Sequence, residues 1–318
     1  MHGGASRFPV LTVAVLCLYL LAALVAEAVR QSARLRDETP EYNRPRLELR
    51  YLPPLTRATD AEGVGHFFWL GSDNLGRSVA QRLLQGARIA LHVGLVSSLL
   101  AVPFGTLLGL FAGWRGGATD ALATWLATTV AAIPAPLLVL AVSLVAGKGL
   151  FGVYLGIGVT TWVGVYRTVR AETVKHRSRG YVLSARALGY STPRILFRHV
   201  LPNVSHLVIV AVSLRFPAAV GTEVFMSFLG LGAQEEPSWG VMINNARVRL
   251  WQGVWWEGLF VTLAVFGLVL AANRLGDWLR DRLDPTLRGS APSPRKISLR
   301  RPSTLIGLCV VSVSGTSA

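Results

Sequence analysis

The sequence predicts an all-α polytopic membrane protein with six transmembrane helices, on the strength of two observations. Hydrophobic residues make up 52% of the 318 residues and charged residues only 15%, whereas roughly 25% are charged in soluble domains. Windows without Asp, Glu, Lys or Arg also recur along most of the chain, with lengths near the roughly 20 residues that a helix needs to cross a bilayer. Their backbone must be helical, because lipid offers no partner to a free N–H or C=O group.

Six windows meet this description, and the fifth of them is interrupted by two charged residues. They are residues 8–26, 89–114, 121–147, 149–166, 204–232 and 258–273. The first window also has features of a signal peptide, because Arg7 precedes it and Ala26-Glu27-Ala28 has the shape of a cleavage site. Its apolar length exceeds that of a signal peptide, so we assign residues 8–28 to a first transmembrane helix.

The distribution of Lys and Arg predicts the orientation, because cytoplasmic loops carry an excess of these residues. Segment 167–203 holds eight of them against the single acid Glu172, so it is predicted to be cytoplasmic. Six spans then place both termini in the cytoplasm, including residues 1–7, and three arginines follow the last window: Arg274, Arg280 and Arg282. Residues 29–88, where acids accompany the arginines, form the predicted external loop. Residues 89–285 form the core permease domain, and residues 286–318, rich in Ser, Pro and Arg, a disordered cytoplasmic tail.

The net charge of +15 would suggest nucleic-acid binding in a soluble protein. Here the basic residues lie beside the apolar windows, where they orient a membrane protein and contact lipid head groups, so no nucleic-acid partner is predicted. Cys17 and Cys309 fit neither a disulfide framework nor a metal site. Without a metal-binding or nucleophile motif, we predict no catalytic residues, metal or cofactor. The phosphate-binding loop is also missing, so any ATP that drives this protein must bind to another chain.

Two features of the middle windows predict how the helices pack. Small residues at four-residue spacing form one stripe on the second window, which favours close approach of another backbone. They are Ala101, Gly105, Gly109 and Gly113. Prolines at positions 103, 134 and 136 are predicted to kink the second and third helices.

The fifth window contains two ionisable residues, Arg215 and Glu223, with Pro217 between them. Such residues inside a membrane usually face a bundle interior or a watery cavity. At eight residues apart they lie within about 80° of each other around a helix, so both are candidates to line a translocation path. The alternative is that each lies near a membrane face, with Arg215 extending toward the surface.

The loop between the fourth and fifth windows predicts two short helices joined by a rigid corner. Apolar residues at helical spacing predict a first amphipathic helix, which Gly189 ends with a left-handed turn. Ser191-Thr192-Pro193 begins a second helix with a hydroxyl cap and a proline in its first turn, and this helix is predicted to end at Leu201-Pro202. Such a projection on the cytoplasmic face suits insertion into a groove of a partner protein.

This loop resembles the Glu-Ala-Ala loop of binding-protein-dependent ABC importer permeases, in particular the second permease of dipeptide, oligopeptide and nickel importers. The similar residues are Tyr181-Val182-Leu183-Ser184-Ala185-Arg186-Ala187-Leu188-Gly189, then Ile195, then Arg198-His199-Val200-Leu201-Pro202-Asn203. Three further stretches fit the same subfamily. They are Leu70-Gly71-Ser72-Asp73-Asn74-Leu75-Gly76-Arg77, Ser227-Phe228-Leu229-Gly230-Leu231-Gly232 with Pro237-Ser238-Trp239-Gly240, and Gly276-Asp277-Trp278-Leu279-Arg280-Asp281 with Leu283-Asp284-Pro285. The resemblance covers residues 65–287, roughly.

The resemblance implies the six-helix, MetI-like fold of a type I ABC importer permease in a bacterial inner membrane, without ATPase activity of its own. Its partners would be a second permease, two ABC ATPases that dock on loop 167–203, and an external solute-binding protein. The implied coupling residues are Tyr181, Ala185, Arg186, Ala187, Leu188, Gly189, Ile195, Leu201 and Pro202. The implied external motif is Gly71, Asp73, Gly76 and Arg77, and Glu223 corresponds to an acid common in the family.

The chain departs from the family pattern at several positions, which bears on any inherited substrate preference. Leu183 replaces the glutamate at the start of the loop motif, Ser78 replaces an aspartate, and Trp125 and Thr128 replace an arginine and an aspartate in the third window. Two other classes of protein stay open. A self-sufficient channel or ion-coupled transporter would need several acids in the spans, where Glu223 is nearly alone, and a membrane-embedded enzyme would need a catalytic cluster.

Overall fold

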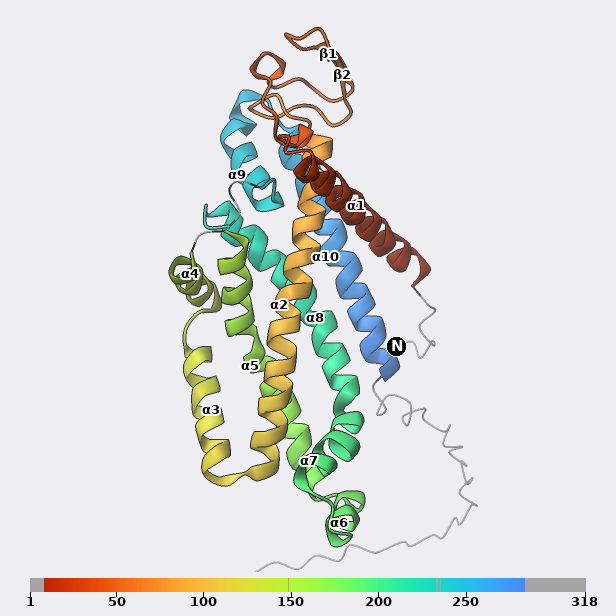
Figure 1. The fold of residues 1–318 in the computed structure, drawn as a ribbon, viewed down its shortest axis with the longest axis vertical. Coiled ribbons are helices and arrows are strands. Elements are labelled where there is room, and N and C mark those ends of the chain that lie inside the picture. The colour runs from red at the N-terminus through yellow and green to blue at the C-terminus, as the bar shows by residue number, and fades with distance from the viewer. Residues whose placement is uncertain (1–8, 148, 233, 235, 284–318) are drawn as a thin grey trace, which may run out of the picture.

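The computed structural model describes residues 9–283 except 148, 233 and 235, and these residues form an elongated bundle of helices (Figure 1). The helices are α1 (Val10–Leu35), α2 (Val79–Arg115), α3 (Gly117–Ala132), α4 (Ala135–Ala146), α5 (Leu150–Arg177), α6 (Gly180–Ala187), α7 (Thr192–Ile195), α8 (Leu201–Phe228), α9 (Trp239–Arg249) and α10 (Trp256–Leu283). A small hairpin of β1 (Thr56–Thr59) and β2 (Gly65–Phe68) lies at one end, and α6 and α7 lie at the other (Figure 1). Residues 1–7, the tail 286–318 and Cys309 lie outside the described residues.

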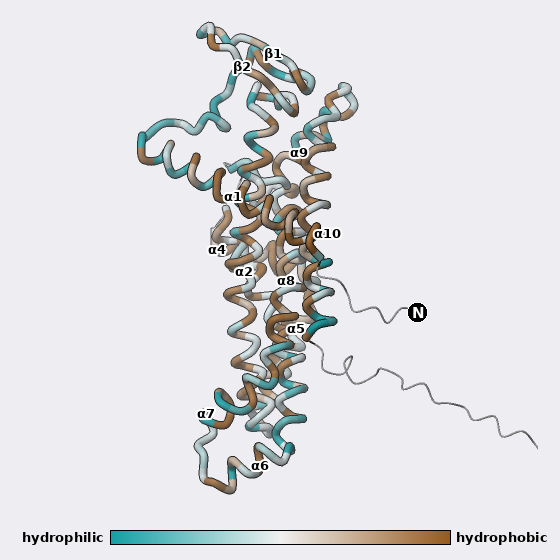
Figure 2. The backbone as a smooth tube through the Cα atoms, turned by 90° about the vertical axis from the view of Figure 1, so that its right-hand side faces the viewer, coloured by the Kyte–Doolittle hydropathy of each residue, from teal (hydrophilic) through white to brown (hydrophobic). Residues whose placement is uncertain are grey.

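The all-α membrane architecture is confirmed. Among the described residues, four helical stretches are long and apolar enough to cross a membrane, namely α1, α2, the continuous run from α7 through α8, and α10; the bent pair α3 and α4 makes a fifth if it is one span. The window 149–166 forms α5 but is not among them, so a count of six spans stays a prediction. Hydrophobic residues follow the central helices, and hydrophilic residues gather in the segment that carries the hairpin (Figure 2).

The third window, predicted as one kinked helix, is two helices whose axes differ by 94°. The break is at Ile133, which has an extended backbone. Pro134 accounts for it, because its ring disfavours helical backbone in the residue before it. Pro136 lies in the first turn of α4, where a missing N–H costs no hydrogen bond. The two prolines therefore separate two helices where the sequence predicted a bend.

The prediction that a helix ends at Pro202 is wrong. From α7 the chain continues through a π-helical turn, Leu196–Val200, directly into α8. Pro202 lies in the first turn of α8, directly after the π-helical turn. The loop therefore leads into α8 without a flexible joint, and α8 itself continues unbroken through Pro217.

Helices α2 and α5 approach each other along the predicted stripe of small residues. A Cβ built on Gly105 would lie 2.6 Å from the carbonyl oxygen of Trp162, and one built on Gly109 would lie 2.9 Å from that of Tyr166. The same holds one turn further on at Gly113. Only glycine permits backbones to pack this closely, so the stripe fixes α2 against α5.

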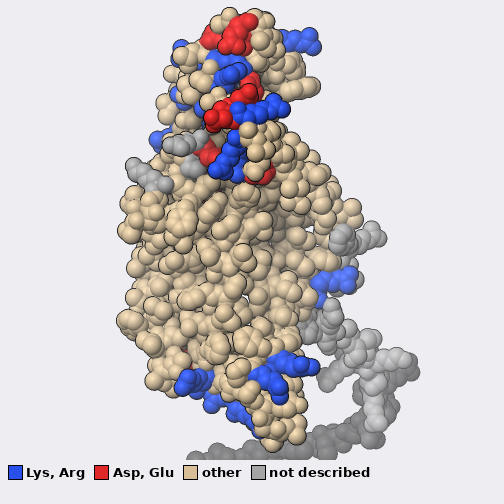
Figure 3. Space-filling view, in the orientation of Figure 1, with Lys and Arg blue, Asp and Glu red and all other residues tan. Residues whose placement is uncertain are grey.

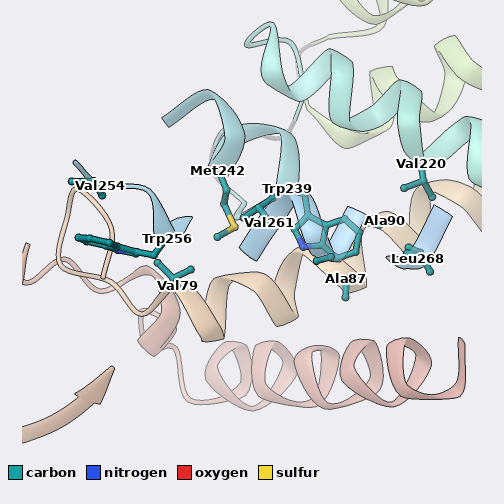
Figure 4. Packing of buried hydrophobic residues seen from close by; sticks show 11 residues of the cluster. Val79, Ala87, Ala90, Val220, Trp239, Met242, Val254, Trp256, Val261 and Leu268 are labelled. Atoms are coloured by element: carbon teal, nitrogen blue, oxygen red, sulfur yellow. The ribbon is translucent and has the colours of Figure 1, made fainter. Parts of the chain in front are cut away.

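The hydrophobic core at the hairpin end is built around Trp239 of α9, which packs beside α2 and α10 (Figure 4). Its indole Nε1 donates a hydrogen bond to the Leu83 carbonyl oxygen at 3.0 Å. A Cβ built on Gly86 would lie 2.2 Å from this indole ring, so glycine makes room for it on α2. Figure 4 shows Ala87 beside the same ring.

The segment predicted as the external loop 29–88 is partly helical. Helix α1 continues to Leu35 and α2 begins at Val79. Between them β1 and β2 pair antiparallel, with Thr56 opposite Phe68. Residues 36–78, hereafter the external segment, form hydrogen bonds with α2, α9 and α10.

Candidate functional site

The loop between α5 and α8, hereafter the coupling loop (residues 178–200), forms the predicted rigid corner. Helix α6 ends at Ala187, and Gly189 just beyond it has a left-handed backbone with φ of 77°. The Gly189 N–H donates to the Arg186 carbonyl oxygen at 2.9 Å, and the Tyr190 N–H donates to that of Ala185 at 3.1 Å. These two bonds satisfy the last carbonyls of α6 and set the direction of the chain into α7. Ser191 precedes α7 as predicted, but its hydroxyl makes no capping hydrogen bond.

The inner face of the coupling loop is anchored in a hydrophobic cluster. Val182, Ala185 and Ile195 are at most 4% exposed. They pack with Leu110 of α2 and Val165 of α5, among others. Of the predicted coupling residues, Ala185 and Ile195 therefore anchor the loop to the bundle and are not available to a partner.

The outer face of the coupling loop is exposed and partly apolar. Leu188 is 72% exposed and Leu183 is 51% exposed. The other predicted residues are also exposed or half-buried, in the coupling loop at Tyr181, Arg186, Ala187 and Gly189, and in the first turn of α8 at Leu201 and Pro202. Large apolar side chains on a fixed helical corner are the kind of surface that enters a hydrophobic groove.

Trp114, near the end of α2, contacts both the coupling loop and the end of α5. The Arg186 guanidinium lies over its ring, 4.3 Å from the centroid, and Nη1 of Arg177 donates to its carbonyl oxygen at 3.1 Å. Sequence reasoning missed Trp114. Its position as the last apolar residue before Arg115 is a signal for a helix end at the membrane surface, but nothing in the sequence indicates its contact with α6.

A second contact joins α6 to α5. The Tyr181 hydroxyl lies 2.6 Å from Nδ1 of His176. Partial burial raises the pKa of the Tyr181 hydroxyl above its usual 10.0. In the face shown in Figure 3, Lys and Arg gather at this end of the molecule, whereas acidic and basic residues alternate at the opposite end. This charge distribution agrees with the predicted cytoplasmic position of the coupling loop.

The external motif forms a closed turn around Asp73, whose side chain is fully buried. Its carboxylate accepts hydrogen bonds from the backbone N–H groups of Leu75 and Arg77, both at 2.9 Å, and from Arg77 Nε at 2.8 Å. Gly71 and Gly76 both have left-handed backbones. All four predicted residues of the external motif therefore belong to one turn: Gly71, Asp73, Gly76 and Arg77. The contacts that hold this turn are internal to the fold.

The same turn is fastened to α10. Indole Nε1 of Trp256 donates to the Ser72 carbonyl oxygen at 3.1 Å, and a Cβ built on Gly71 would lie 2.7 Å from that indole. Arg82 of α2 reaches Asp73 from the other side, with Nε 3.5 Å from Oδ2. The motif thus ties the external segment to α2 and α10.

Glu257 is a buried carboxylate that sequence reasoning missed. It is fully buried in the first turn of α10, and neither of its oxygens has a hydrogen-bond partner in the described part of the chain. The last apolar window begins one residue later, at Gly258. From the sequence alone, Glu257 is therefore predicted to be an acid at the membrane surface and not a buried one. Its burial follows from the contact of α10 with the external segment.

Arg215 and Glu223, the candidates for the translocation path, lie in different surroundings. Glu223 is 1% exposed, and one of its oxygens accepts a hydrogen bond from the Ser227 hydroxyl at 2.6 Å. Arg215 is half-buried against Gly164 of α5. The expectation that both line one path stays a prediction; within this subunit Glu223 is enclosed. Three or more His, Cys, Asp or Glu residues gather nowhere in residues 9–283, gaps excepted, in a way that could hold a metal ion.

Comparison with known proteins gives consistent matches. Residues 105–289 match the family described as the binding-protein-dependent transport system inner membrane component. The chain is 38% identical over 221 residues to the dipeptide transport system permease protein of Bacillus subtilis (strain 168), with 69% of each chain covered. It is 39% identical over 228 residues to the glutathione transport system permease protein of Pectobacterium atrosepticum, covering 71% of this chain and 75% of that one.

The fold also matches a solved structure, that of the MetNI methionine ABC transporter in inward-facing conformations. The TM-score is 0.54, and the match covers 64% of this chain and 96% of that one at 15% sequence identity. At this identity the likeness concerns the fold alone. It agrees with the MetI-like fold that the family resemblance implies.

Proposed function

The chain belongs to the family of inner-membrane components of binding-protein-dependent transport systems, and we propose that it is the permease subunit through which an ATP-driven importer moves di- or oligopeptides. The relatives are permease proteins by name, so ATP hydrolysis belongs to partner subunits. Support for a peptide solute comes from the names of the relatives, which are transport permeases for dipeptides, oligopeptides and glutathione.

We further propose that the chain pairs with a second permease and receives its solute from an external binding protein. Two ATPases dock on the coupling loop, which lies in the cytoplasm together with both termini, and the external segment lies on the opposite side. ATP-driven closure of the ATPases would bias the permease pair between inward-facing and outward-facing states, as a remote ligand biases a two-state element. The charge distribution between the two ends supports this orientation.

One observation carries the proposal: the coupling loop presents exposed apolar side chains on a corner that is fixed to the bundle. Leu188 is the most exposed large apolar residue of α6 and the turn after it. Its neighbour Ala185 is held in the hydrophobic cluster, so the surface cannot retract into the bundle. A surface that is apolar, exposed and rigid is expected to be covered by a partner protein.

The test is a substitution of Leu188 by Asp, with Leu47→Asp as the matched control. Leu47 is 53% exposed but lies in the external segment. Leu188→Asp should weaken co-purification of the ATPases at least about tenfold, as expected for a central interface residue, and should abolish peptide uptake. Leu47→Asp should leave ATPase association unchanged. Both variants must insert into the membrane at wild-type levels, and equal ATPase association in the two would refute the docking role.

The orientation is tested separately by thiol labelling in right-side-out vesicles, starting from a variant without Cys17 and Cys309. A cysteine placed at Ala61 in the external segment should react with a membrane-impermeant reagent. A cysteine placed at Ser184 of α6 should react only after the vesicles are opened. Labelling of Ser184→Cys in sealed vesicles would reverse the proposed orientation.

A further inference from the structure

A pocket between α5, α8 and α10 contains two arginines in a wall that is otherwise largely apolar. Its volume is about 360 Å³. Its lining includes Gly164 of α5, Leu207, Leu214 and Arg215 of α8, and Arg280 of α10. Two guanidinium groups beside aliphatic side chains favour a ligand that carries both a negative charge and a hydrocarbon portion.

Gly164 of α5 makes room for the Arg215 guanidinium in this pocket. A Cβ built on Gly164 would lie only 1.7 Å from Nη2 of Arg215, so the guanidinium lies directly against the α5 backbone and any larger residue would displace it. No acidic side chain in the described part of the chain pairs with Arg215. A partly desolvated charge without a counter-charge is costly, so an anion from outside the chain is the expected partner.

The position of the pocket along the bundle indicates the source of this anion. Arg280 lies in the last turn of α10, and Leu207 lies near the start of α8, which follows the coupling loop. The pocket therefore lies toward the end of α10 that is nearer to the coupling loop. In the orientation proposed above, this end is cytoplasmic, where basic pockets between transmembrane helices bind anionic lipid head groups.

We propose that this pocket binds one anionic phospholipid from the cytoplasmic leaflet. The phosphate accepts hydrogen bonds from Arg215 and Arg280, whose planar guanidinium groups match the geometry of phosphate oxygens. The glycerol and first acyl carbons lie along Leu207 and Leu214. This ligand supplies both the counter-charge that Arg215 lacks and the apolar contact that the wall offers, whereas a small inorganic anion supplies only the first.

The test uses the full-length chain, purified from membranes with its partner subunits and delipidated. Dioleoyl phosphatidylglycerol and dioleoyl phosphatidylethanolamine are titrated separately, and bound lipid is counted by native mass spectrometry. Wild-type protein should bind phosphatidylglycerol in preference to phosphatidylethanolamine. Arg215→Gln should weaken this binding by about tenfold to a hundredfold, the loss expected for a hydrogen bond to a charged group.

Two more variants separate the site from general charge effects. Gly164→Ala keeps every charge but forces the guanidinium from its place, so it should also reduce phosphatidylglycerol binding. Arg274→Gln removes an exposed charge from the same helix as Arg280 but outside the pocket lining, so it should bind like wild type. Wild-type protein without lipid preference, or equal losses for Arg274→Gln and Arg215→Gln, would overturn the proposal.

The experiment also distinguishes a solute from a lipid. A soluble dipeptide is added as competitor, alongside the same dipeptide with an amidated C-terminus. Displacement of phosphatidylglycerol by the free carboxylate and not by the amide would assign the pocket to the solute and overturn the lipid site. Because the measurement involves neither transport nor ATP, loss of the lipid site would leave the proposed importer function untouched.

Discussion

Helices α2 and α5 meet along a row of glycines, and replacing one of these, Gly105, by alanine is expected to destabilise the bundle. The new Cβ would lie 2.6 Å from the Trp162 carbonyl oxygen and 2.9 Å from Cβ of Val165. Neither atom can move unless α5 itself shifts. Overpacking of this kind costs about 1–3 kcal/mol, and the upper part of that range applies because the closest atom belongs to the backbone. Alanine regains about 1 kcal/mol of helix propensity, which leaves a net loss of about 1–2 kcal/mol.

Gly221→Ala is the matched control, because Gly221 lies within α8 and a Cβ built on it meets nothing within 4 Å. This variant should gain the helix propensity without the clash, so the two substitutions should change stability in opposite directions. The assay is thermal unfolding of the purified protein in one detergent, followed by intrinsic fluorescence. If Gly105→Ala unfolds at the same or a higher temperature than Gly221→Ala, the close contact of α2 with α5 is not as described.

Two further predictions concern the two ends of the molecule. Arg186→Gln removes the cation–π contact with Trp114, worth about 0.5–1 kcal/mol at an exposed site, so amide hydrogens of α6 should exchange faster, while Arg186→Lys should retain part of the protection. At the other end, a hydrogen bond from His66 and one from the Val64 N–H lower the pKa of Asp60 below its usual 3.8. Because a lowered carboxyl pKa stabilises the fold above the unfolded-state value, this contribution is lost as the pH falls through the folded-state pKa. Amide exchange at Val64, measured as opening relative to the intrinsic rate, should therefore increase below about pH 4, and Asp60→Asn should remove this pH dependence.

Local sequence signals predicted the parts of the fold that depend on local chemistry. The glycine spacing on α2 predicted the contact with another backbone, because residues four apart share a helix face whatever the partner is. Gly189 predicted the end of α6, because only a residue that accepts a left-handed backbone closes a helix in this way. Neither inference required knowledge of distant residues.

Predictions failed where the same residue type is compatible with two local structures and tertiary packing decides between them. Proline either ends a helix or occupies its first turn, and Pro202 does the second because α7 already leads the chain into α8. Ile133 is extended, so Pro134 breaks a helix that the sequence predicted to bend. The presence of a proline does not by itself predict which of these outcomes occurs.

Only part of the candidate site could be predicted from the sequence, again because tertiary packing decides the rest. Helical spacing placed Ala185 and Leu188 on one predicted helix but did not separate the side that packs into the bundle from the side that is exposed. The contact of Arg186 with Trp114 joins residues far apart in the chain, and so does the burial of Glu257 beneath the external segment. Contacts of this kind follow from the assembled fold, and a single sequence carries no signal for them.

Helix α2 connects the two ends of the molecule as one continuous element. Its 37 residues span about 55 Å, with Arg82 beside the turn of Asp73 at one end and Trp114 against the coupling loop at the other. The glycine row packs α2 against α5 without space for sliding, so a displacement of the coupling loop by a partner should move these two helices together as a rigid body. Helix α4 belongs to the same unit, because a Cβ built on Gly156 of α5 would lie 2.8 Å from the Val139 carbonyl oxygen and the Ser143 hydroxyl donates to the Gly152 carbonyl oxygen at 3.0 Å. Helices α2, α4 and α5 are therefore expected to shift as one body with the coupling loop, which leaves the extended backbone at Ile133 as the joint to α3.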